Sequence, residues 1–110
     1  MTPFTLRDLE RRIQERAGAT AETSYTRKLL DKGISHCAKK LGEEAVETAL
    51  AAVGENRERL IAETADLLYH LLVVLNARGV ALADVEAALA GRVSQSGLEE
   101  KASRKSSPSA

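Results

Sequence analysis

Two pairs of acidic residues stand at a spacing that suits the binding of a cation. Glu44 and Glu47 are three residues apart, as are Glu63 and Asp66. On an α-helix this spacing places both side chains of a pair on one face, within reach of a common ion. If the two helices pack antiparallel, the four carboxylates can converge on one point. Carboxylate oxygens of this kind suit Mg²⁺, with Mn²⁺ as an alternative.

The alternative is that these carboxylates are solvated or take part in ion pairs. For Glu44 and Glu47 alone exposure is favoured, because glutamates on exposed helices are common. The segment around Glu63 and Asp66 differs, because apolar residues occupy nearly all of its faces, which is typical of a buried helix. A carboxylate there is unfavourable unless it is paired or binds a metal. The pattern alone therefore leaves metal binding and a salt bridge as equal interpretations.

The elements that must position these acids are helices. Helix-forming residues dominate and aromatic residues make up 3% of the 110-residue chain, which predicts an all-α fold. A first helix is expected at about 5–17, followed at 19–33 by a loop with room for one helical turn. Three further helices are expected at about 35–53, 56–78 and 82–92.

The helix expected at 35–53 carries a seam of small residues that would let a partner helix approach closely. The seam comprises Ala38, Leu41, Ala45, Ala49 and Ala52. After the last helix, the segment 94–110 is rich in Ser, Lys and Glu, and we expect it to be a polar, mobile tail. Residues 1–93 are then expected to form one helical domain.

The composition limits the classes of function. The formal net charge is +0, so no global basic field attracts nucleic acid or an acidic membrane surface. Cys37 is the single cysteine, which excludes an intramolecular disulfide and suits the cytosol. The longest apolar run, 67–75, is far shorter than the roughly 20 residues that span a bilayer. Residues 1–19 lack the apolar core of a signal peptide. We therefore expect a cytoplasmic protein that binds neither nucleic acid nor membrane.

The acidic residues and the segments around them resemble a known family. E-E-x-x-E at 43–47 followed by E-x-x-D at 63–66 is similar to the metal signature of the all-α nucleoside-triphosphate pyrophosphatase (MazG-like) superfamily. Within that superfamily, S-Y-T-R-K-L-L at 24–30 and D-L-L-Y-H-L-L-V at 66–73 resemble the phosphoribosyl-ATP pyrophosphohydrolase family. The resemblance covers about residues 4–92.

The resemblance implies a fold and an activity. The fold would be a four-to-five-helix bundle completed by dimerisation, in a homodimer or a higher homo-oligomer. The substrate would be a small-molecule nucleotide, 1-(5-phosphoribosyl)-ATP, which is hydrolysed to 1-(5-phosphoribosyl)-AMP and diphosphate in the second step of histidine biosynthesis. The cofactor would be Mg²⁺, which offsets the charge of the triphosphate and stabilises the leaving diphosphate.

The same resemblance implies roles for the acidic residues. The metal ligands would be Glu44, Glu47, Glu63 and Asp66. Glu43 would activate the attacking water or hold a second ion; its alternative is an exposed residue paired with a neighbouring lysine. His70 follows Asp66 by one helical turn, so it would support that ligand, although a hydrogen-bonded core histidine is the more ordinary role.

Basic and polar residues before the acidic motif are candidates for contact with the substrate. The candidates for phosphate binding are Lys28, Lys32 and Lys40, with solvent exposure as the alternative for each. Ser24 and Thr26 would donate hydrogen bonds to phosphate or cap a short helix. Tyr25 would stack on a base or pack within the protein.

Two other functions fit parts of the sequence. A house-cleaning pyrophosphatase for dUTP or damaged nucleotides would use the same acidic cluster, but the S-Y-T-R-K segment argues against it. A non-catalytic helical oligomerisation module would leave the acids exposed and would need no divalent ion. A di-iron bundle requires two Glu-x-x-His motifs, which the sequence lacks.

Overall fold

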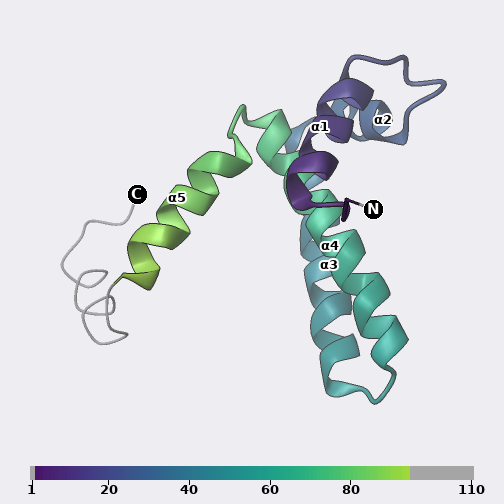
Figure 1. Ribbon diagram of the computed structural model, residues 1–110. Coiled ribbons are helices and arrows are strands. Elements are labelled where there is room, and N and C mark those ends of the chain that lie inside the picture. Colours follow the sequence, from purple (N-terminus) through teal and green to yellow (C-terminus); the bar gives the residue numbers. More distant parts are fainter. Residues whose placement is uncertain (1, 95–110) are drawn as a thin grey trace. The chain divides into compact units, whose positions relative to one another are not determined.

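The structure, a computed structural model, describes residues 2–94, and these residues form five helices and no strand. In chain order the helices are α1 (Leu6–Ala17), α2 (Tyr25–Asp31), α3 (Ile34–Val53), α4 (Arg57–Ala77) and α5 (Leu82–Val93) (Figure 1). The prediction of an all-α fold is confirmed. The described residues form two compact units: the first holds α1 to α4 and ends at Val80, and the second begins at Ala81 and holds α5. Apart from Ser94, the tail predicted at 94–110 lies outside the described residues.

The ends of α1 and α4 follow from local hydrogen bonds. At the start of α1, the side chain of Thr5 accepts from the Asp8 backbone N–H while the Asp8 carboxylate accepts from the Thr5 backbone N–H, which is a capping box. Helix α4 begins after Asn56, whose side chain accepts a hydrogen bond from the backbone of Arg59 at 3.0 Å. It ends at Ala77, and Gly79, two residues further along, has a φ of +67°, a conformation that glycine adopts without steric cost. Both helices lie within about one residue of their predicted bounds.

Helix α2 is longer than the single turn predicted for this segment. Ser24 is its N-cap, and the Ser24 hydroxyl oxygen accepts from the Arg27 backbone N–H at 3.1 Å. The Arg27 guanidinium also donates to Asp31 at 2.8 Å, one turn further along. Leu29 is 2% exposed, so this helix places an apolar side chain in the core. The cap, the ion pair and this burial stabilise a helix of seven residues here.

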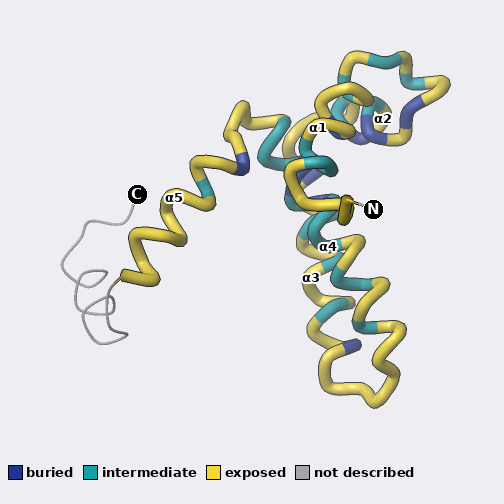
Figure 2. The backbone as a smooth tube through the Cα atoms, viewed as in Figure 1, coloured by how far each residue is buried: buried dark blue, intermediate teal, exposed yellow. Residues whose placement is uncertain are grey.

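Helices α3 and α4 form an antiparallel hairpin (Figure 1). The side of α3 withdrawn from solvent is not the predicted seam of small residues. Its members recur every three or four residues: Cys37, Leu41, Glu44, Thr48 and Ala51. Apart from Leu41, the predicted seam is exposed in the described chain, as is the stripe formed by Val46, Leu50 and Val53 (Figure 2). The prediction that the alanine seam meets a partner helix is therefore wrong for α4.

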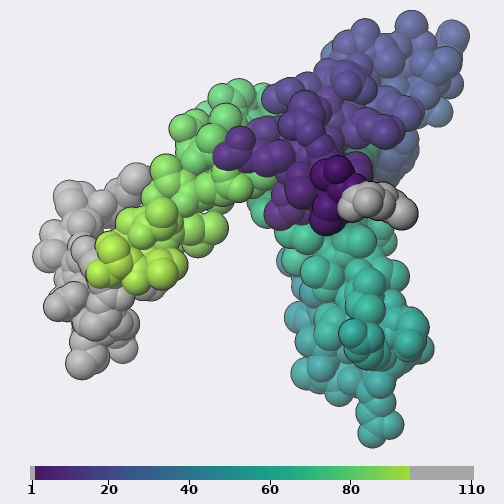
Figure 3. Space-filling model, in the orientation of Figure 1, coloured from purple at the N-terminus to yellow at the C-terminus, as the bar shows by residue number. Residues whose placement is uncertain are grey.

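The two ends of the hairpin differ in their surroundings. Atoms of α1 cover one end, whereas the end that holds the turn between α3 and α4 stands clear of α1 and α2 (Figure 3). Around the covered end lie fully buried side chains such as Ile13 and Val73. At the open end each helix has a single helical neighbour within the first unit, so one side of each remains exposed.

By length and composition, α4 passes for a helix that could cross a membrane: an 18-residue window has a mean hydropathy of 1.4 and is 17% buried within the chain. The core helix of a soluble protein passes the same test of length and composition, but such a helix is mostly buried. Glu63 and Asp66 lie on this helix, and ionisable groups are costly inside a bilayer. The two acids therefore favour the interpretation that protein, and not lipid, covers the apolar surface of α4.

Candidate active site

The hairpin brings three of the predicted acidic residues together. One carboxylate oxygen from each of Glu44, Glu63 and Asp66 lies within 4.8 Å of the others. Glu44 comes from α3 and the other two come from α4, where a separation of three residues keeps them on one face. Glu44 and Glu63 are half-buried, whereas Asp66 is exposed, although the apolar pattern of α4 predicted that it would point inward. Hard oxygen ligands at this spacing fit a divalent cation such as Mg²⁺.

The hydroxyl of Thr48 sets the register of this acidic trio. Its Oγ1 lies 2.8 Å from the backbone carbonyl oxygen of Glu44 and 3.1 Å from that of Glu63. The first contact is within α3 and the second crosses to α4. The side chain therefore holds the two backbones that carry carboxylates at a fixed separation.

The other two acids of the motif have cationic partners. The carboxylate of Glu47 lies 3.2 Å from Arg59 of α4, and Glu47 is not among the three converging residues. The carboxylate of Glu43 lies 3.5 Å from Lys40, one turn before it on α3. The role of Glu47 as a metal ligand therefore stays a prediction. So does the role of Glu43 as the base that activates water.

Glu63 lies in an unfavourable environment for a negative charge. Partial burial raises the pKa of its carboxyl above the ordinary value, and the nearby carboxylates of Glu44, Glu47 and Asp66 raise it further. Arg59 opposes this shift. A bound cation stabilises negative charges that converge in this way. The charge environment of Glu63 therefore supports the interpretation of the trio as a metal site.

His70 lies one turn beyond Asp66 and is 6% exposed. Its Nδ1 is buried without a hydrogen-bond partner in the described chain. Burial lowers the pKa of its imidazole, and the positive charge of Lys40 lowers it further. Its ring meets that of Tyr69 edge to face, with centroids 5.1 Å apart. The imidazole is therefore a buried group whose surroundings disfavour its charged form.

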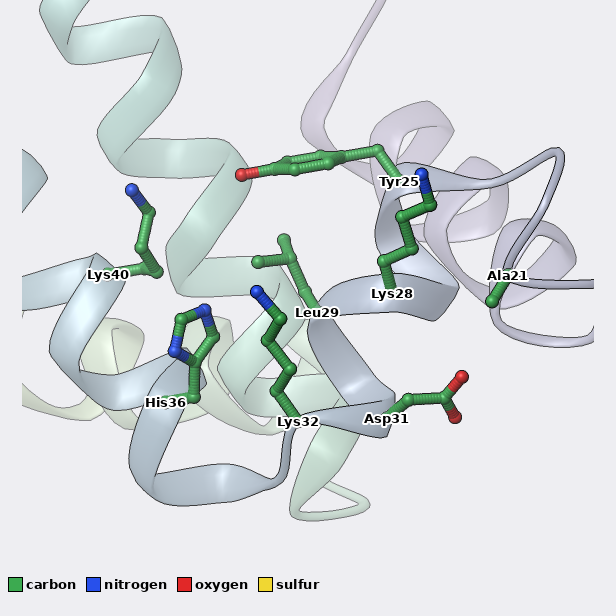
Figure 4. A pocket seen from close by; sticks show the side chains of 8 residues that line it. All are labelled: Ala21, Tyr25, Lys28, Leu29, Asp31, Lys32, His36 and Lys40. Atoms are coloured by element: carbon green, nitrogen blue, oxygen red, sulfur yellow. The ribbon is translucent and has the colours of Figure 1, made fainter.

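The three lysines predicted to bind phosphate line one pocket, which has a volume of about 420 Å³. The pocket lies between α2 and the first half of α3. Its lining is Ala21, Tyr25, Lys28, Leu29, Asp31, Lys32, His36 and Lys40 (Figure 4). Sequence reasoning missed His36 as a member of this group, because a single histidine in a polar turn carries no periodic signal.

The residues of the S-Y-T segment differ in their access to a ligand. Ser24 and Thr26 are 2% and 4% exposed, and their hydroxyls are engaged within the protein. Ser24 caps α2 and donates to the Arg16 carbonyl at 3.0 Å, while the Thr26 hydroxyl lies 2.6 Å from that of Tyr69. The alternative role of Ser24 as a helix cap is thus the one seen. Tyr25 is 57% exposed and stacks on Tyr69, so one face of its ring is available.

Comparison with known proteins identifies the family. The family model for phosphoribosyl-ATP pyrophosphohydrolase matches residues 6–93, which include the acidic trio and the lysine-lined pocket. The chain belongs to the phosphoribosyl-ATP pyrophosphohydrolase family. The resemblance found in the sequence is therefore confirmed, and with it membership of the MazG-like all-α superfamily and of the hydrolases.

Relatives of this family are similar over nearly their whole length. A protein of Bradyrhizobium diazoefficiens named phosphoribosyl-ATP pyrophosphatase 1 is 67% identical over 105 residues, which cover 96% of this chain and 99% of the relative. A phosphoribosyl-ATP pyrophosphatase of Azorhizobium caulinodans is 67% identical over 103 residues, which cover 94% of each chain. One from Rhizobium meliloti is 60% identical over 104 residues, 94% of this chain and 97% of the relative.

Proposed function

We propose that this protein hydrolyses 1-(5-phosphoribosyl)-ATP to 1-(5-phosphoribosyl)-AMP and diphosphate, the second step of histidine biosynthesis. The observation that carries the proposal is that the 20-residue helix α3 contributes to two opposite charge environments. Its first half lines a pocket with three lysines, and its middle contributes Glu44 to the acidic trio. A polyanionic nucleotide needs direct cationic contacts as well as carboxylates that hold a divalent cation. Identity of 60–67% to phosphoribosyl-ATP pyrophosphatases supports this substrate.

We assign Mg²⁺ to the acidic trio, with Mn²⁺ as a substitute. When bound, the ion offsets the charge of the triphosphate and stabilises the leaving diphosphate. Glu44, Glu63 and Asp66 hold it, and Glu47 joins them when its carboxylate leaves Arg59. Glu43 is exposed at the edge of the cluster, where its carboxylate accepts a proton from the attacking water. Lys40, beside Glu43, contacts the phosphates nearest the cluster.

The working protein is a homodimer or a higher homo-oligomer in the cytoplasm, associated with neither nucleic acid nor membrane. Support comes from large apolar side chains on the open faces of the hairpin. Val46, Leu50 and Ile61 are 53–59% exposed in the chain by itself. A second copy that covers them would bury this apolar surface.

The test is product analysis with a panel of substrates. The purified protein is incubated with phosphoribosyl-ATP, ATP and dUTP at fixed Mg²⁺, and released diphosphate is measured. We expect phosphoribosyl-ATP to be hydrolysed with a kcat/KM at least about 100-fold above the others, because its second ribose phosphate adds contacts that they lack. Comparable turnover of dUTP would instead indicate a house-cleaning pyrophosphatase, and no turnover with any divalent ion would indicate a non-catalytic module.

A matched pair of variants tests the metal assignment. Asp66→Asn keeps the shape of a ligand and removes its charge, so we expect turnover to fall by about 100-fold or more with the fold unchanged. Glu58→Gln removes one carboxylate from an exposed position near the start of α4 and should leave turnover unaltered. Wild-type rates for Asp66→Asn at limiting Mg²⁺ would refute the assignment.

A further inference from the structure

The lysine-lined pocket reaches well beyond the acidic trio. Lys40 lies at the near end, because it contacts Glu43 at 3.5 Å and its charge acts on His70. His36 precedes Glu44 by eight residues on α3, which corresponds to about 12 Å along the helix axis. Lys32 caps α2 just before α3 begins. The pocket therefore extends over two helical turns from the carboxylates toward the beginning of α3.

The proposed substrate carries anionic groups at two ends. A triphosphate is attached to one ribose, and a phosphomonoester is attached to C5 of the other, with the purine between the two sugars. The acidic trio, through its cation, neutralises the triphosphate end only. The remote phosphate needs cationic and hydrogen-bonding partners of its own, at a distance set by the purine and the sugars.

The far end of the pocket has the groups that such a phosphate requires. Lys28 and Lys32 are four residues apart and lie on one face of α2. In Figure 4 the side chain of Lys32 extends beside the imidazole of His36, while the carboxylate of Asp31 points away from both. Asp31 is also paired with Arg27, so its charge is already offset. Two ammonium groups and an imidazole N–H are donors that suit a dianionic phosphate.

The beginning of α3 adds a further positive contribution. Its N-cap is Gly33, which provides no side-chain hydrogen bond, and the first turn contains no acidic residue. The positive end of the helix dipole is therefore not neutralised by the protein beside His36. By itself this end would not define a site; together with the lysines it increases the attraction for an anion.

We propose that Lys28, Lys32 and His36 bind the 5-phosphate of the phosphoribosyl group and thereby distinguish the substrate from ordinary nucleoside triphosphates. The inference rests on the proposed function, because it takes the triphosphate to be held at the acidic trio. The exposed ring of Tyr25 lines the same pocket and offers a face to the purine.

The deciding experiment compares two substrates that differ in one group. These are 1-(5-phosphoribosyl)-ATP and 1-ribosyl-ATP, which lacks the 5-phosphate. For Lys32→Ala we expect kcat/KM to fall about tenfold with the first substrate, through KM, because a charge-assisted contact is lost. With 1-ribosyl-ATP the change should be less than about twofold, since the contact is absent already. Lys39→Ala is the control, because Lys39 is exposed and does not line the pocket.

An equal loss with both substrates would overturn the inference, since Lys32 would then contact the triphosphate. No loss with either substrate would overturn it as well. If the proposed function is wrong, the result differs, because the wild-type protein then does not hydrolyse phosphoribosyl-ATP. In that case ribose 5-phosphate with EDTA serves as the probe. It should shift the His36 ring signals in nuclear magnetic resonance spectra of the wild type but not of Lys32→Ala, and unshifted wild-type signals would refute the site.

Discussion

Glu47 and Arg59 form an ion pair across the hairpin, with the carboxylate of the first 3.2 Å from the guanidinium of the second. The pair competes with the predicted role of Glu47 as a metal ligand. Arg59→Gln should therefore bind Mg²⁺ a few-fold more tightly, because it frees Glu47 and removes a positive charge near Glu63. Isothermal titration calorimetry with Mg²⁺ measures this change directly.

A charge-matched control separates the pair from a general charge effect. Arg57→Gln removes the same charge from the exposed first residue of α4 and should alter Mg²⁺ affinity much less. Weaker Mg²⁺ binding by Arg59→Gln would mean that Arg59 holds the acidic residues in place, and Glu47 would then lose its assignment as a ligand.

Thr48 controls the separation of the helix backbones that carry Glu44 and Glu63. Thr48→Val keeps the shape of the side chain and removes the hydroxyl. We expect the free energy of unfolding to fall by about 1 kcal/mol, the usual value of a partly buried hydrogen bond. We also expect half-saturation by Mg²⁺ to move several-fold higher, because the ligands lose their fixed separation. Chemical denaturation and activity titrations measure the two effects.

Thr48→Ser distinguishes the hydrogen bond from the packing of the methyl group. It retains the hydroxyl, so its Mg²⁺ dependence should stay close to that of the wild type. If Thr48→Val and Thr48→Ser shifted Mg²⁺ half-saturation equally, the interhelical hydrogen bond would have no part in positioning the ligands.

The elements predicted well from the sequence are those whose ends depend on nearby residues. Thr5 with Asp8 at the start of α1, and Asn56 and Gly79 around α4, act through hydrogen bonds and backbone conformations that span a few positions. Helix α2 was underestimated, because part of its stability comes from burial of Leu29 against other segments. A local propensity cannot include that contribution.

The side of α3 that faces α4 could not be chosen from periodicity. The alanine seam and the side that carries Glu44 and Thr48 both recur at helical spacing, and the choice depends on what α4 offers opposite. The same limit applies to the site. A separation of three residues places Glu44 and Glu47 near one another on α3. The position on α3 that contacts the backbone of α4 is nevertheless that of Thr48, and the carboxylate of Glu47 pairs with Arg59.

The raised pKa of Glu63 predicts a dependence of stability on pH. Between the ordinary value of 4.5 and the raised value, the folded protein binds a proton that the unfolded chain does not. Without divalent ions, the free energy of unfolding should therefore decrease as the pH rises through this window. Mg²⁺ competes with that proton, so its affinity should fall as the pH is lowered toward the raised pKa. Thermal unfolding in EDTA and in Mg²⁺, from about pH 5 to about pH 8, measures both trends.

Glu63→Gln tests whether the carboxyl of Glu63 causes this pH dependence. It should be more stable than the wild type in EDTA at neutral pH, because the costly charge is gone, and it should gain little stability from Mg²⁺. Glu55→Gln, in the exposed turn between α3 and α4, should behave as the wild type does. A wild-type pH profile for Glu63→Gln would show that another group titrates.

Leu50 tests the proposed assembly. Its side chain is 53% exposed on the open face of α3, on the same stripe as Val46 at 59%. Leu50→Glu places a charge where a second copy would bury apolar surface, so we expect sedimentation velocity to show mainly monomer. Phe4→Glu is the control: Phe4 is 66% exposed but precedes α1 and belongs to neither helix of the hairpin. Because burial of an unpaired glutamate is strongly unfavourable, an unchanged sedimentation coefficient for Leu50→Glu would place the subunit contact elsewhere.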